Sequence, residues 1–67
     1  MLKIETEQEN DGRWIAEIAA IPGALAYGRT EDEAVANVKA LALRVIADRL
    51  EHGESVPIEA QGLFEAA

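Results

Sequence analysis

The feature that most constrains this chain is a helical repeat that fills almost a third of its length. After Ala34, apolar residues recur at three- and four-residue spacing, which is the period of one buried helix face. Thr30 and Glu33 match a capping box at the start of this repeat, and Gly53 is a typical stop after its end. The sequence therefore predicts one helix of about 20 residues. Its expected buried positions are Val35, Val38, Leu41, Ala42, Val45, Ile46 and Leu50.

The residues before the helix alternate between apolar and polar types, as half-buried strands do. Residues 2–9 put leucine, isoleucine and threonine on one side and lysine and glutamate on the other. The Asn-Asp-Gly run at 10–12 is typical of a tight hairpin, so residues 13–18 should return antiparallel. In that second strand, Trp14 faces the core and Ile15 faces outward.

Two further segments complete the expected fold. Pro22-Gly23 matches a type II turn, after which residues 24–27 form a short third strand that ends at Gly28. Beyond the helix, residues 56–59 are expected to add a short edge strand, where the proline is tolerated. The predicted fold class is α+β, an antiparallel three-stranded meander followed by one long helix and a short edge strand (β-β-β-α-β).

The chain is short for the surface that it must cover. At 67 residues it has room for a single domain, residues 1–67, with a core over 1–59 and a tail over 60–67. Because it has no cysteine, neither a disulfide nor a thiolate metal site adds to the shallow core. A chain this short buries only part of its surface on folding, so we expect a homo-oligomer. The alternating N-terminus lacks the continuous apolar run of a signal peptide or a membrane span. We therefore expect a cytoplasmic protein that does not enter a membrane.

Negative charge dominates the composition and bears on possible partners. Thirteen Asp and Glu against six Lys and Arg give a formal net charge of −7. Such a surface repels phosphate backbones, so direct nucleic-acid binding is not expected. The same field would speed encounter with a basic protein, although it also serves solubility alone.

The residues suited to catalysis are few and scattered. His52 falls in the last predicted helical turn, where an imidazole suits the negative end of the helix dipole, and Ser55 belongs to the turn that follows. The acidic runs at 5–9 and 31–33 are clustered in sequence, but a hydrolytic metal site needs carboxylates that converge from different elements. We expect no catalytic residue, no metal site, no cofactor and no enzymatic activity.

The order and spacing of several short motifs resemble the N-terminal domain of the HicB antitoxin family. The resemblance covers nearly the whole chain. The motifs are Asp11-Gly12-Arg13-Trp14 with Ala16-Glu17, then Ile21-Pro22-Gly23, then Tyr27-Gly28-Arg29-Thr30 with Glu33-Ala34.

What the resemblance implies is a reduced ribonuclease H-like sheet without catalytic acids, which binds a small basic toxin of the HicA type. Such toxins are ribonucleases, and HicB antitoxins block them by contact. Two features depart from the family pattern. Arg29 stands where an acidic residue is common, and nothing after Gly53 has the basic helical pattern of the family's DNA-binding segment, so we do not expect operator binding by this chain alone.

The leading hypothesis is an antitoxin-like binding module without a reaction of its own. Its expected partner-contact residues are Glu5, Glu7 and Glu9 on the outer face of the first strand, with Ile15 beside them. The same acids would also suit a solvated strand that resists aggregation. The alternative function is a homo-oligomeric structural or regulatory protein without a toxin partner.

Overall fold

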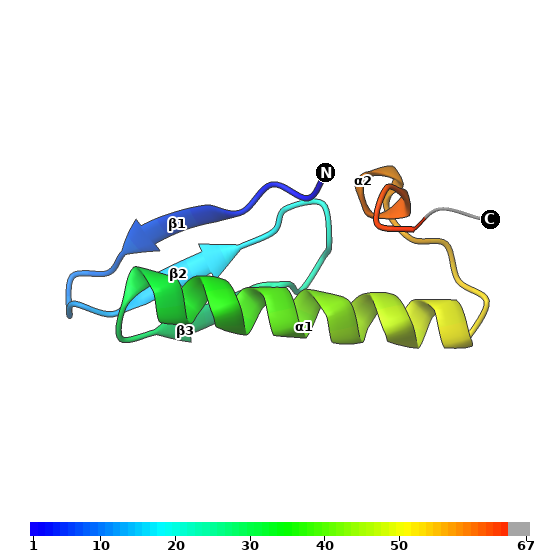
Figure 1. Ribbon diagram of the computed structural model, residues 1–67. Coiled ribbons are helices and arrows are strands. Elements are labelled where there is room, and N and C mark those ends of the chain that lie inside the picture. Colours follow the sequence, from blue (N-terminus) through cyan, green and yellow to red (C-terminus); the bar gives the residue numbers. More distant parts are fainter. Residues whose placement is uncertain (65–67) are drawn as a thin grey trace.

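A computed structural model describes residues 1–64 and contains one antiparallel sheet and two helices (Figure 1). The strands pair in the order β1-β2-β3, and the long helix follows the third strand. This arrangement confirms the predicted α+β meander followed by one long helix. The elements are β1 (Glu5–Gln8), β2 (Trp14–Glu17), β3 (Leu25–Gly28), α1 (Glu31–Glu51) and α2 (Ile58–Gln61).

Both predicted turns of the sheet rest on glycines with positive φ. Gly12 has φ 93° in the hairpin between β1 and β2, and Gly23 has φ 86° between β2 and β3. The backbone N–H of Ala24 donates to the carbonyl of Ile21 at 3.0 Å, which closes the Pro-Gly turn. The local chemistry read from the sequence therefore sets the two reversals of the chain.

The N-terminus of α1 has the predicted cap with one difference. The Thr30 hydroxyl accepts the backbone N–H of Glu33 at 3.1 Å. The Glu33 carboxylate reaches back to the N–H of Arg29 at 3.2 Å, one residue before the cap residue that a standard capping box would engage. Both side chains still satisfy backbone N–H groups at the start of the helix.

The C-terminus of α1 closes on the predicted glycine. Gly53 has φ 69°, and the N–H of Glu54 donates to the Arg49 carbonyl at 2.8 Å, as in a Schellman motif. His52 is the C-cap residue, and its Nδ1 lies 2.7 Å from the Asp48 carbonyl oxygen. The histidine thus has the structural position that its sequence context predicted.

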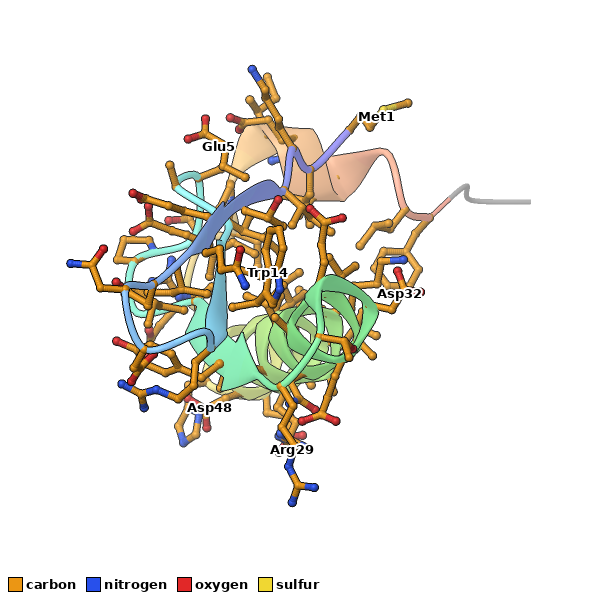
Figure 2. All side chains as sticks on the ribbon, turned by 90° about the vertical axis from the view of Figure 1, so that its left-hand side faces the viewer. Met1, Glu5, Trp14, Arg29, Asp32 and Asp48 are labelled. Atoms are coloured by element: carbon orange, nitrogen blue, oxygen red, sulfur yellow. The ribbon has the colours of Figure 1, made fainter. Side chains whose placement is uncertain are left out.

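The core lies between α1 and one face of the sheet, and small side chains fill most of it. Trp14 is half-buried and packs against this core, as predicted, in the space between the sheet and α1 (Figure 2). Because alanine is short, the helix axis approaches the sheet closely. The buried apolar residues of the described chain are Ala16, Ile18, Ile21, Ala24, Ala34, Val38, Ala42, Ile46 and Ala60.

The buried face of α1 differs in part from the predicted one. Val38, Ala42 and Ile46 are buried as expected, whereas Leu50 is 53% exposed. The true face is a row at four-residue spacing that begins at Ala34. Apolar residues occur around most of the helix, so their spacing alone does not select the row that meets the sheet.

The predicted edge strand at 56–59 is wrong. Residues 54–57 form no regular element, and α2 begins at Ile58. Pro57 has no N–H to pair with a neighbouring strand, and its φ of −55° suits the residue before a helix. The short helix α2 buries Ala60, whose N–H donates to the Pro57 carbonyl at 2.9 Å. Of the predicted tail, residues 65–67 lie outside the described part.

Candidate protein-binding face

The sheet surface turned away from α1 combines carboxylates with apolar side chains. In the strand register Glu5 pairs with Glu17, which also pairs with Leu25. In the next outward-facing row Ile15 lies between Glu7 and Tyr27. Because Ala16 and Trp14 pack on the core, their strand neighbours point outward. We call this surface the acidic face and define it by Glu5, Glu7, Ile15, Glu17, Leu25 and Tyr27.

The carboxylates of the acidic face lie near one another in the strand register. Glu5 and Glu17 are direct cross-strand partners, and like charges in such positions destabilise a sheet. Within residues 1–64, neither these two acids nor Glu7 takes part in a salt bridge. The three acids, with Ile15 and Leu25, border a shallow hollow of about 150 Å³. The acidic face therefore carries a local excess of negative charge beside exposed apolar surface.

Arg13, at the hairpin end of the sheet, contacts Asp11 and Tyr27. Its Nε donates to Asp11 Oδ2 at 2.7 Å, and its guanidinium carbon lies 4.8 Å from the centre of the Tyr27 ring. The backbone N–H of Arg13, 3.0 Å from Asp11 Oδ1, lowers the pKa of Asp11 below its ordinary 3.8, and the guanidinium lowers it further. Arg13 thus pairs with the hairpin acid and lies over Tyr27, and it forms no salt bridge with Glu5, Glu7 or Glu17.

The structure brings together three of the four expected contact residues. Glu5, Glu7 and Ile15 share the acidic face. Glu9 lies beyond the end of β1, is half-buried, and uses its N–H to bond the Arg13 carbonyl at 2.7 Å in the hairpin turn. It therefore belongs to the turn that closes the sheet.

Sequence reasoning did not list three members of the acidic face as contacts. Glu17 has the outward phase that the alternation of the second strand predicted, and the hairpin register then puts it opposite Glu5. Leu25 and Tyr27 are 40% and 44% exposed, and their placement depends on the pairing of β3 with β2. The sequence signal that could have found them is the strand register. Once the lengths of both turns are known, the residues that face each other across the three strands can be counted.

Among residues 1–64, no set of three or more His, Cys, Asp or Glu side chains is placed to hold a metal ion. Over that same part of the chain, no helix combines the length and apolarity needed to cross a membrane. Ser55 is exposed in the segment after α1, away from the sheet (Figure 1).

A second surface feature is an apolar groove of about 610 Å³ between the start of the chain, α1 and the C-terminal segment. It lies beside the half of α1 that extends past the strands, where α2 is the nearest covering element (Figure 1). Residues that line this apolar groove include Met1, Leu2, Ile4, Lys39, Leu43, Glu59 and Leu63. It is formed by different residues from the acidic face.

Comparison with known proteins identifies no relative of this chain. No protein-family model, curated protein or solved structure matches the chain. The resemblance to HicB antitoxins therefore stays a prediction made from the residues.

Proposed function

We propose that this chain is a non-catalytic binding module that uses its acidic face to hold a small basic protein. The observation that carries the proposal is the pairing of Glu5 with Glu17 across β1 and β2, with Glu7 nearby and no cation in salt-bridge contact among the described residues. Opposed carboxylates cost stability in the free sheet. A cationic partner would relieve that repulsion, so the arrangement favours binding of a basic surface.

The apolar members of the acidic face suit the same kind of partner. A lysine or arginine side chain can lay its methylene groups on apolar surface while its charged end meets carboxylates. The shallow hollow between Ile15, Leu25 and the three acids offers both kinds of contact. Tyr27, at 44% exposure, adds an aromatic side chain of the type enriched at interface hot spots.

The partner proposed is a ribonuclease toxin of the HicA type, which the chain would neutralise by covering its RNA-binding surface. This part draws on the resemblance to HicB antitoxins and on the net charge of −7. An RNA-binding protein is positive where it meets phosphates, so one basic surface can fit either RNA or the acidic face. The proposal keeps the cytoplasmic location and the absence of direct nucleic-acid binding that the sequence led us to expect.

The alternative function, a homo-oligomeric protein without a toxin partner, is favoured by the apolar groove. This surface carries exposed apolar side chains and does not include the acidic face. The two functions therefore depend on different residues, and substitutions can separate them.

A growth-rescue experiment tests the antitoxin role. The reading frame beside this gene is expressed alone and together with the chain, and growth is recorded. We expect a small basic protein that arrests growth alone, and rescue when the wild-type chain is present. The double variant Glu5→Gln, Glu17→Gln should lose the rescue.

The matched control is Glu51→Gln, Glu54→Gln, which removes the same charge at the far end of α1 from the sheet (Figure 1). It should rescue growth as the wild type does. Equal rescue by both double variants would overturn the role of the acidic face. Absence of a growth-arresting basic neighbour would leave the homo-oligomeric alternative as the better account.

A further inference from the structure

The hydrophobic core of the described chain is small for the surface around it. Nine apolar side chains are buried, and five of them are alanine. The largest fully buried side chains are Ile18, Ile21 and Val38. A core of this size supplies little free energy, and small domains commonly gain more by burying surface against another chain.

Large apolar side chains remain exposed around the apolar groove. Met1, Leu43 and Leu63 line it from three different segments and are each about half or more exposed. Ile58 and Phe64, on the same C-terminal segment, are 78% and 69% exposed. Ile58 and Phe64 are not part of the groove lining, but exposed apolar side chains gathered at one groove are of the kind that marks protein interfaces.

The total surface also exceeds that of a compact monomer. The accessible area is 4918 Å², several hundred Å² above the roughly 4,100 Å² expected for a folded monomer of this mass. The excess is of the same order as the roughly 800 Å² that each partner contributes to a stable interface. The chain as a whole therefore has surface that a second copy could bury.

The charges at the groove favour a second copy of this chain as its occupant. Lys39 on α1 and Glu59 on α2 both line the groove, and they form no salt bridge with each other. A two-fold axis sets the same patch of both copies against itself. Lys39 of each copy can then meet Glu59 of the other, which gives two ion pairs around an apolar centre.

We propose that the apolar groove is the interface of a symmetric dimer, in which Leu43 and Leu63 pack across the axis and Lys39 pairs with Glu59 of the other copy. The dimer leaves the acidic face of each copy free. It is independent of the proposed binding function, and its failure would not affect that function.

Sedimentation velocity and light scattering over a concentration series from micromolar to near-millimolar test the dimer. We expect a species of twice the chain mass of 7.2 kDa. Leu43→Glu puts a charge in the centre of the interface and should weaken association roughly 100-fold. The matched control is Leu50→Glu, also an exposed leucine of α1 but outside the groove lining, and it should dimerise as the wild type does.

Charge reversal provides a second test that does not depend on the apolar centre. Lys39→Glu alone and Glu59→Lys alone should each weaken the dimer roughly tenfold or more, because each leaves like charges facing across the interface. An equimolar mixture of the two variants should recover a dimer, since opposite charges then face each other at both positions. An ion pair within one chain would gain nothing from mixing.

Circular dichroism of each variant checks that the fold is retained. A wild-type chain that stays monomeric over the whole concentration range would overturn the proposal. A dimer that persists in Leu43→Glu would also overturn it, because the interface would then lie elsewhere. Failure of the mixed variants to associate would contradict the pairing of Lys39 with Glu59.

Discussion

Single small residues set how closely α1 approaches the sheet. Gly28 ends β3 and is buried, and a Cβ atom at that position would overlap the backbone nitrogen of Ala34 and lie 2.9 Å from its Cα. A neighbouring backbone cannot move aside as a flexible side chain can. The sequence marked Gly28 only as the end of a strand, because the contact joins two elements whose separation is a tertiary property.

Gly28→Ala should therefore destabilise the fold through steric overlap. We expect a loss of about 2–3 kcal/mol in the free energy of unfolding, measured by urea denaturation. Gly62→Ala is the matched control, because nothing lies within 4 Å of a Cβ built at that glycine. It should change stability by less than about 0.5 kcal/mol. Equal effects of the two substitutions would contradict the close packing of β3 on α1.

Asp11 should titrate below its ordinary pKa of 3.8, because Arg13 stabilises its charged form. A pKa lowered by folding contributes stability at pH values above the ordinary one, and that contribution is lost as the pH falls through the folded-state pKa. The side-chain carboxyl carbon of Asp11, followed by NMR, should show a midpoint under 3.8. In Arg13→Gln the midpoint should rise only part of the way toward 3.8, because the backbone N–H of residue 13, the larger cause, remains. A wild-type midpoint at or above 3.8 would contradict the contact.

At the scale of elements, local signals predicted the turns and both ends of α1. Gly12, Gly23 and Gly53 all have the positive φ that their turn or cap positions require. The edge strand failed for a reason that is also local, since the fixed φ of Pro57 suits the residue before a helix and α2 begins directly after it. The buried row of α1 was only partly predictable, because α1 is apolar on more than one side and tertiary packing selects the face.

Thr30→Ala should weaken the start of α1 by removing the hydroxyl that accepts the Glu33 N–H. We expect a loss of about 1 kcal/mol in the free energy of unfolding, which is typical for an N-cap threonine. Thr30→Ser keeps the hydroxyl and should retain most of this stability. Thermal denaturation of the three proteins measures the difference. If the alanine and serine variants were equally stable, the cap would contribute nothing through its side chain.

At the scale of the whole molecule, the fold separates two surfaces of different chemistry. The acidic face covers one side of the sheet, and the apolar groove lies among the chain start, α1 and the C-terminal segment. In Figure 2, Glu5 and Met1 mark the strand and the chain start that contribute to these two surfaces. We propose that the chain associates through one surface and binds a different protein through the other.

Strand alternation predicted part of the acidic face. The outward positions of Glu5, Glu7 and Ile15 follow from the alternation of side chains along two strands. The position of Leu25 requires the pairing register of all three strands. Glu9 was expected on the same surface from strand alternation alone, but β1 ends before it, and its backbone closes the hairpin opposite Arg13. The apolar groove could not be predicted, because it depends on where the C-terminal segment packs after the helix.

The central claim is that the acidic face binds a basic protein, and the most direct measurement is the affinity of the neighbouring basic protein for three forms of this chain. Calorimetry compares the wild type, Glu5→Gln with Glu17→Gln, and the control Glu51→Gln with Glu54→Gln. We predict that the acidic-face variant binds roughly 10- to 100-fold more weakly, that the control binds as the wild type does, and that wild-type affinity falls as salt rises. Equal affinities for all three forms, unchanged by salt, would contradict the claim.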